Sequence, residues 1–494
     1  MNTPIRRLAI FSMILFAALM LQTTWIQGFR AEAIKDDPLN GRQYTERLTE
    51  PRGPIEIAWE AVAYSEDISE EDEQPRYQRV YEGGGLYTPV VGSFRSYGAS
   101  GIESTENALL DGSDDQLAVR NFRDVLTGRE PEGANVQLTI DPAVQEAGYN
   151  GFIDQGKNGA AVALDPSTGA ILGAVSYPSY DANDVSSVTD QEASNNNWVE
   201  LEQDENKPLL NRAFRERYPP GSTFKVVTAA AAIEYLDATP DSTMDAPDVL
   251  ELGHPLPNAT PGGTCNEGDP DTLAHSIQIS CNTSLANWAI EVGGSDLHEQ
   301  AVGFGFQPEP EEGQEEEELQ ELEVPLPVVP SLAPDEGEDR NILGRAGIGQ
   351  SNVESSPLQM AMVSAGIANS GEVMHPYLVD SVRDSDMSVV TQSSPESYSQ
   401  ATSASTAQML TEMMTLVTQE GGSGTNAAIP GMEVAGKTGT AETGGEQGTH
   451  NWFIGFAPAD DPQIAVAVVI EHGGGSGNEN AAPIARQMME AVVL

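Results

Sequence analysis

The stretch YPPGSTFKVVTAAAAIEYL, from Tyr218 to Leu236, predicts the centre of the fold. Its Pro-Pro-Gly breaker ends the preceding element, and the long run of small apolar residues that follows predicts a buried helix. Ser222 then lies at the helix N-terminus, where free N–H groups and the helix dipole favour negative charge. Because Lys225 follows at i+3, its amine is expected on the same face, within reach of the Ser222 hydroxyl.

This pair of residues could form a nucleophile and its base. A serine hydroxyl is a poor nucleophile unless a neighbouring base takes its proton. A lysine amine can do so when burial lowers its pKa, whereas an arginine cannot. An N-cap serine followed by a surface lysine would give the same spacing, so Ser-x-x-Lys alone does not decide between the two interpretations.

Two further motifs favour the catalytic interpretation. Ser280-Cys281-Asn282 precedes another helical pattern, and Lys437-Thr438-Gly439-Thr440 follows a break and comes fifteen residues before the strand that begins at Trp452. In this order the three motifs resemble those of the penicillin-recognising serine acyltransferases, Ser-x-x-Lys, Ser-x-Asn and Lys-Thr-Gly. Two of the five lysines of the chain lie in these motifs, which indicates that the sites need an amine and not merely a positive charge.

The resemblance covers nearly the whole chain. RGPIEIAWEAVA from Arg52, GIE from Gly101, TIDPAVQ from Thr139 and GIGQSNVESSPLQMA from Gly347 are similar to landmarks of class B penicillin-binding proteins. The single anchor, the first folded region and the lack of C-terminal repeats are most similar to the actinobacterial penicillin-binding protein A group. An acidic segment in the middle of the chain departs from that group.

The resemblance implies a peptidoglycan D,D-transpeptidase that cross-links stem peptides through a serine acyl-enzyme and that penicillin inactivates. Ser222 is then the nucleophile, Lys225 its base, Ser280 a proton relay and Asn282 an orienting group. Lys437 is expected to keep Lys225 neutral and to attract the substrate carboxylate.

The third motif is also expected to bind substrate. The resemblance implies that Thr438, Gly439 and Thr440 contact the substrate and that the two threonine hydroxyls bind its carboxylate. The backbone N–H groups of Ser222 and Thr440 are expected to form the oxyanion hole, which is a preorganised electrostatic device.

The patterns around the motifs predict an α+β fold. A hairpin from Asn158 and a second pair of strands from Asn451 flank Ala-rich helical stretches, so one antiparallel sheet is expected to combine distant segments. We expect a cytoplasmic tail at 1–7, a transmembrane anchor at 8–29, a pedestal domain at 30–155 and a transpeptidase domain at 156–494. Within the last, Gln307 to Arg340 is predicted to be an acidic, disordered insertion.

The N-terminus predicts a single-pass membrane protein. Arg6 and Arg7 precede an uncharged stretch that is long enough to cross a bilayer, so the body is expected outside the cytoplasm. A cleavable signal is the alternative, because Ala31-Glu32-Ala33 resembles a cleavage site, but the apolar run is longer than a usual signal core. Outside the cell Cys265 and Cys281 are expected to form a disulfide.

The charge and composition exclude other classes of function. A formal net charge of −52 argues against nucleic-acid binding, since nothing could neutralise a row of phosphates. The six histidines include no pair at metal spacing, so we expect no metal and no cofactor.

Rival functions share parts of the same machinery. A class A β-lactamase would need a Glu-x-x-Leu-Asn loop after the second motif, and none follows Asn282. A D,D-carboxypeptidase differs only in its acceptor and stays open, as does a β-lactam-binding scaffold or sensor of a cell-wall complex. A membrane glycan polymerase is the expected partner, while a role in elongation or in septation is left open.

Overall fold

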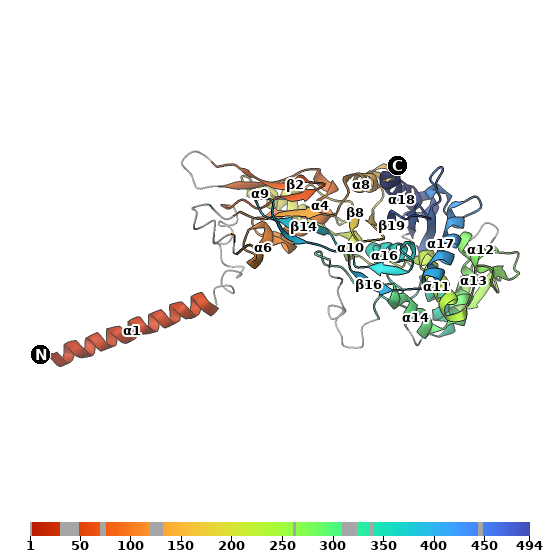
Figure 1. Cartoon of the computed structure of the whole chain (residues 1–494), viewed down its shortest axis with the longest axis horizontal. Coiled ribbons are helices and arrows are strands. Elements are labelled where there is room, and N and C mark those ends of the chain that lie inside the picture. The colour runs from red at the N-terminus through yellow and green to blue at the C-terminus, as the bar shows by residue number, and fades with distance from the viewer. Residues whose placement is uncertain are drawn as a thin grey trace.

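The computed structural model of the chain describes residues 2–29, 49–69, 76–118, 120, 132–259, 263–308, 322, 324–335, 337, 339–442 and 448–494. Figure 1 shows two folded parts side by side, a pedestal that contains the first strands and a larger part that contains the C-terminal sheet. The helix α1 (Asn2–Phe29) includes a stretch from Ile5 to Ile26 with a mean hydropathy of 1.8, and none of that stretch is buried against the rest of the described chain. Within the described residues it is the one helix that is long and apolar enough to cross a membrane.

Strands from distant parts of the chain form the central sheet of the larger part, as the sequence predicts. The strand order is β17-β18-β19-β7-β8, and all neighbours are antiparallel. Leu164 of the first hairpin pairs with Ala465 near the C-terminus. The bounds of the strands are Ala435–Glu442 for β17, Thr449–Ala457 for β18, Ile464–Ile470 for β19, Gly159–Leu164 for β7 and Ile171–Tyr177 for β8.

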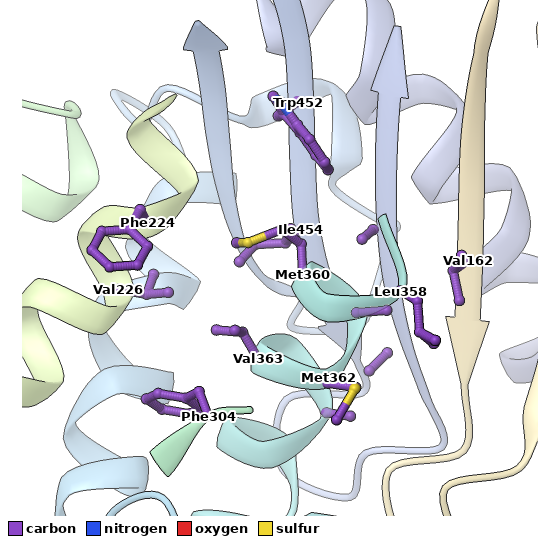
Figure 2. Close-up of a cluster of buried hydrophobic side chains, with 14 of the residues drawn as sticks. Val162, Phe224, Val226, Phe304, Leu358, Met360, Met362, Val363, Trp452 and Ile454 are labelled. Carbon is purple, nitrogen blue, oxygen red and sulfur yellow. The ribbon is translucent and has the colours of Figure 1, made fainter. Parts of the chain in front are cut away.

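Helices cover both faces of this sheet. Every residue of β19 is buried, because α18 (Gly477–Val493) packs on one face and α16 (Pro357–Ala368) on the other. In the view of Figure 2, Val363 of α16 lies toward Phe224, whereas Leu358 lies toward Val162 of β7. A strand that is buried on both faces needs the continuous apolar run that this sequence has.

The first helix of the larger part lies against the last. α8 (Pro142–Gln155) begins after Asp141, whose side chain accepts hydrogen bonds from the backbone N–H groups of Ala143 and Val144. Two of its glycines are needed for close packing on α18. A Cβ at Gly148 would come within 3.0 Å of Met488 Sδ, and one at Gly151 within 2.9 Å of Ile484 Cγ1.

The helical layer surrounds α11 (Lys225–Leu236), which contacts α13 (Asn282–Val292), α14 (Gly294–Gly303) and α17 (Ala404–Thr418). Its alanines at 229–232 are all fully buried. Small side chains at these positions allow neighbouring helices to approach closely without leaving voids. α11 therefore has a fixed place, which also fixes the segment that precedes it.

The pedestal differs from the expected division of the chain at residue 155. Its six-stranded sheet has the order β15-β14-β6-β1-β2-β3, and two of these strands come from residues that were predicted to belong to the transpeptidase domain. The bounds are Ile55–Ile57 (β1), Glu60–Asp67 (β2), Tyr77–Tyr81 (β3), Asn135–Leu138 (β6), Val379–Arg383 (β14) and Val389–Gln392 (β15). The two parts are therefore interleaved along the chain.

Two of the quoted landmark motifs meet in the core of the pedestal. Arg52 and Arg79 donate to opposite oxygens of the fully buried Glu103, at Nε–O distances of 3.0 and 2.5 Å. Burial alone would raise the pKa of Glu103, but the two guanidinium groups outweigh it and hold the pKa below its usual value. Removing one partner from such a buried group typically costs about 3–5 kcal/mol.

The predicted insertion from Gln307 to Arg340 is corrected in its second half. The glutamate run at 309–321 lies outside the described residues, so the prediction of disorder there is not tested. The Pro-rich part, in contrast, is packed, since Val324, Leu326 and Val328 are buried in the main core. The backbone N–H of Val329 donates to the carbonyl of Phe214 at 2.8 Å.

The physical reason for this correction is that apolar residues alternate along the Pro-rich sequence. In VPLPVVP the apolar side chains at alternate positions lie on one face of an extended segment, which gives that face a continuous contact with the core. The prediction considered the composition of this segment together with that of the neighbouring glutamates, so the alternation was not recognised. We use the name Pro-rich segment for residues 324–335.

Candidate active site

Ser222 lies in a tight turn and not in the α-helix itself. A 3-10 turn, Gly221–Phe224, carries the serine, and α11 begins one residue later with Lys225. This differs from the predicted helix N-terminus by a single turn. Gly221 has a φ of +55°, which favours glycine, and its N–H donates to the carbonyl of Gly349 at 2.8 Å.

The landmark Gly347-Ile348-Gly349 therefore supports the Ser222 turn. A Cβ at Gly349 would lie 2.1 Å from the carbonyl oxygen of Gly221, so no larger residue fits there. A second support comes from β18, where the indole Nε1 of Trp452 donates to the carbonyl of Pro219 at 3.0 Å. Trp452 is fully buried, as expected for a core aromatic, and its hydrogen bond to the turn could not be read from the sequence.

Tyr218, the residue before the two prolines, is also held in place by hydrogen bonds. The Tyr218 hydroxyl donates to Glu471 Oε1 at 2.7 Å, and the same oxygen accepts from Arg212 Nε at 3.0 Å. The backbone of Tyr218 exchanges two hydrogen bonds of 2.9 Å with Ser355. Sequence patterns do not indicate these partners, because they lie 137 to 253 positions away.

The three motifs meet at the hydroxyl of Ser280. Lys437 Nζ donates to Ser280 Oγ at 2.7 Å and to the carbonyl of Thr438 at 2.9 Å. Lys225 Nζ lies 3.3 Å from the same Oγ and donates to the Ser280 carbonyl at 2.8 Å and to Asn282 Oδ1 at 2.7 Å. One serine thus connects two lysine amines from opposite sides of the site.

Both amines are driven toward their neutral forms. Burial lowers the pKa of Lys225 well below its ordinary value, and the charge of Lys437 lowers it further. Burial also lowers the pKa of Lys437, to about 7. Among the described residues neither amine forms an ion pair with a carboxylate, despite the acidity of the chain, so nothing opposes these shifts. An amine with such a pKa can accept a proton near neutral pH.

The second motif is fixed by a disulfide and by an asparagine. Cys281 is bonded to Cys265, with their Cα atoms 5.7 Å apart. The side chain of Asn258 then caps α13 from outside, since its Oδ1 accepts from the N–H groups of Asn282 and Thr283 at 3.1 Å each. Asn258 was not predicted, because its position in the sequence shows only a polar residue in a loop.

Ser280 adopts an unusual backbone conformation. Its φ of +65° lies in the left-handed region, which costs a residue with a side chain about 1–2 kcal/mol. Backbone strain of this kind is concentrated at functional sites. The left-handed conformation turns the Ser280 side chain and carbonyl toward the two lysine amines.

A cleft of about 270 Å³ opens at this junction. Of the predicted site residues it is lined by Ser222, Ser280, Asn282, Thr438, Gly439 and Thr440. Lys225 and Lys437 are fully buried and are not among its lining residues. The lining also includes residues that the sequence did not single out, among them Gln350, Ser423, Glu442, Thr449, Ser476 and Asn478.

The third motif lies on an edge strand. Among the described strands β17 pairs with β18 alone, and residues of β17 line the cleft on its other side. Such an edge can pair with an extended peptide. Gly439 permits the close approach of the Ser222 turn, because a Cβ there would lie 3.0 Å from the carbonyl oxygen of Pro220.

A family model, the penicillin binding protein transpeptidase domain, matches residues 159–490. The chain belongs to this family. A second model, the penicillin binding protein A dimerisation domain, matches residues 52–136 of the pedestal. These matches bear out both the resemblance and the predicted fold class.

Full-length relatives of this penicillin-binding protein are known. The peptidoglycan D,D-transpeptidase PbpA of Mycolicibacterium smegmatis is 38% identical over 100% of this chain and 99% of its own length. That of Mycobacterium tuberculosis is 36% identical with the same coverage. The solved penicillin G acyl-enzyme complex of penicillin-binding protein A from M. tuberculosis matches with a TM-score of 0.81 and 36% identity, over 90% of this chain and 100% of that chain.

Proposed function

We propose that this chain is a peptidoglycan D,D-transpeptidase that works through an acyl-enzyme on Ser222. The observation that carries the proposal is the pair of buried lysine amines, with lowered pKa values, that both contact Ser280 Oγ beside the Ser222 turn. The names of the two full-length relatives support the same activity.

In the first step Ser222 Oγ attacks the carbonyl carbon of the penultimate D-alanine of a stem peptide. The neutral amine of Lys225 takes the hydroxyl proton as the new C–O bond forms. Backbone N–H groups of Ser222 and Thr440 stabilise the oxyanion of the tetrahedral intermediate. The C–N bond then breaks, and Ser280 passes a proton from Lys225 to the departing amine of the terminal D-alanine.

The remaining residues bind and orient the substrate. Lys437 and the hydroxyls of Thr438 and Thr440 attract its carboxylate, and Asn282 orients Lys225 and the substrate amide. In the second step the amine of a neighbouring stem peptide attacks the acyl-enzyme, which releases Ser222 and forms the cross-link. A penicillin follows only the first step, since its opened ring stays attached to Ser222.

Labelling with a fluorescent penicillin tests the nucleophile. Ser222→Ala should abolish labelling while the melting temperature stays unchanged, and Ser405→Ala, on the exposed start of α17, is the matched control that should label normally. Lys225→Arg should fail almost as completely, because it keeps a charge and loses the base. Stoichiometric labelling of the Ser222→Ala protein would remove this residue as nucleophile.

The products separate transpeptidation from its alternatives. Incubation with stem peptides that carry an acceptor amine should give cross-linked dimers in addition to free D-alanine. Release of D-alanine without dimers would identify a D,D-carboxypeptidase, and acylation by penicillin without turnover of peptides would identify a scaffold or sensor.

We also propose a location and a partner for the chain. The apolar helix α1 anchors the chain in the cell membrane with its folded parts outside the cytoplasm, supported by Arg6 and Arg7 before the apolar stretch. A membrane glycan polymerase would supply the strands that are cross-linked. External protease should digest the folded parts in intact spheroplasts, and co-purification from the native membrane should recover the polymerase.

A further inference from the structure

A second cavity lies between the pedestal and the transpeptidase part. Its volume is about 280 Å³, compared with about 270 Å³ for the active-site cleft. One wall comes from the pedestal between Thr88 and Gly101, the opposite wall from residues 208–215, and a third from Leu326 and Pro327 of the Pro-rich segment. Neither the three motifs nor the proposed reaction uses this cavity.

The charge of this cavity is opposite to that of the whole chain. Acidic residues outnumber basic ones by 76 to 24, yet no Asp or Glu is among the lining residues, and one arginine, Arg215, is. Arg215 is exposed at the end of α10 (Arg212–Arg215), and its guanidinium forms no ion pair or hydrogen bond with any described residue. Its neighbour Arg217, in contrast, pairs with Glu354 at 3.1 Å.

A second polar group of the cavity also lacks a partner. The amide of Asn211 donates from Nδ2 to the carbonyl of Pro89 at 2.6 Å, which fixes the orientation of the side chain. Its Oδ1 is buried and accepts no hydrogen bond from any described residue. A buried acceptor without a donor is costly, so an N–H or O–H group of a ligand that reaches it when the pocket wall opens slightly is favoured.

The rest of the lining is mainly apolar. Pro89, Pro208, Leu209, Leu326 and Pro327 present side chains that can contact small apolar groups. The complete lining thus combines a cation, a nearby acceptor that needs a donor, and walls that suit methyl-sized side chains. A concave apolar site with a few convergent polar groups is the usual form of a ligand pocket.

We propose that this cavity binds the free carboxyl end of a peptide with small apolar residues. The terminal carboxylate pairs with Arg215, and a backbone N–H of the same peptide donates to Asn211 Oδ1. This rests on the proposed function, under which the matching peptide outside the cytoplasm is an uncross-linked stem that ends in two D-alanines. A fully ionised phosphate ester fits less well, because it brings acceptors only and leaves Asn211 Oδ1 unsatisfied.

The test uses protein whose active-site cleft is already occupied. The full chain is acylated with penicillin G, the adduct is verified by intact mass, and binding of radiolabelled diacetyl-L-lysyl-D-alanyl-D-alanine is measured by equilibrium dialysis. We expect one peptide to bind per acylated protein. The peptide with a C-terminal carboxamide, and the variant Arg215→Gln with the original peptide, should each bind at least about tenfold more weakly, since each lacks one partner of a charge-assisted contact.

The controls separate this site from others. Arg486→Gln removes a surface arginine that pairs with Glu490 on α18, and it should leave binding unchanged. Binding that is equal in the wild type and in Arg215→Gln, displacement by equimolar inorganic phosphate, or no binding to fully acylated protein would each overturn the inference. A missing penicillin adduct would instead contradict the proposed function, so the two failures are distinguishable.

Discussion

The strained serine of the second motif allows the effect of its hydroxyl to be separated from the effect of its backbone conformation. Ser280 has a φ of +65°, and its hydroxyl contacts both lysine amines. Ser280→Gly removes the hydroxyl and relieves the strain, whereas Ser280→Ala removes the hydroxyl and keeps the strain. We expect both variants to lose acylation and the glycine variant to be the more stable of the two.

The magnitudes follow from the geometry. Left-handed backbone costs a residue with a side chain about 1–2 kcal/mol, and the greater freedom of glycine in the unfolded chain costs about 0.4–1 kcal/mol. The Ser280→Gly protein should therefore be about 0.5–1 kcal/mol more stable than the Ser280→Ala protein. A hydrogen bond to a charged group contributes about 1.5–3 kcal/mol, so loss of the Lys437 contact should slow acylation about 10- to 150-fold.

Stopped-flow acylation by a fluorescent penicillin and urea unfolding of both variants measure these two quantities. Ser370 is a matched control, since it has a φ of +57° at an exposed position after α16, far along the chain from the motifs. Ser370→Gly should stabilise the protein without changing acylation. The reasoning is refuted if either Ser280 variant acylates within about threefold of the wild-type rate, or if the two variants are equally stable.

Three further outcomes are expected. The acylation efficiency should fall at low pH, where Lys225 takes up a proton, and again as the pH rises above about 7, where Lys437 loses its charge. An acylation efficiency that stays constant from about pH 5 to 10 would contradict both assignments. Reduction of the disulfide between Cys265 and Cys281 should cost about 3 kcal/mol and slow acylation, because Cys281 lies inside the second motif; two alkylatable thiols in native, unreduced protein would exclude this effect. Replacing 309–321 with a short Gly/Ser linker should leave the acylation rate within about threefold, whereas extending the replacement through the buried Pro-rich segment should lower the melting temperature by several degrees; a hundredfold slower rate in the shorter replacement would show that the glutamate run belongs to the site.

The sequence predicts well the features that follow from patterns of neighbouring residues. The antiparallel sheet from both ends of the chain follows from the apolar runs and turns, and the buried α11 follows from its alanines. The residues of the three motifs could be named because an amine, a hydroxyl and their spacing have a chemical meaning. Their common contact at Ser280 Oγ is a property of the folded chain, which spacing alone does not contain.

Three features could not be predicted, for different physical reasons. The partners of Tyr218 and Trp452 lie far away along the chain, and hydrogen bonds across such separations leave no periodic signal. The strands β14 and β15 join the pedestal from the middle of the transpeptidase region. Their sequences resemble those of other strands, so they do not indicate which sheet the strands join. The packing of the Pro-rich segment was not recognised, because the neighbouring charged residues dominated the average composition of the region.

The register of the central sheet also sets the timing of folding during synthesis. β7 cannot complete its pairing until β19 has been made, about 300 residues later, which takes about 15–60 s at ordinary translation rates. Throughout that interval the β7–β8 hairpin has an apolar edge without its permanent neighbour, and such edges invite aggregation. A chain that stops before Ile464 would contain all three motifs and still lack the strand that joins the two ends of the sheet.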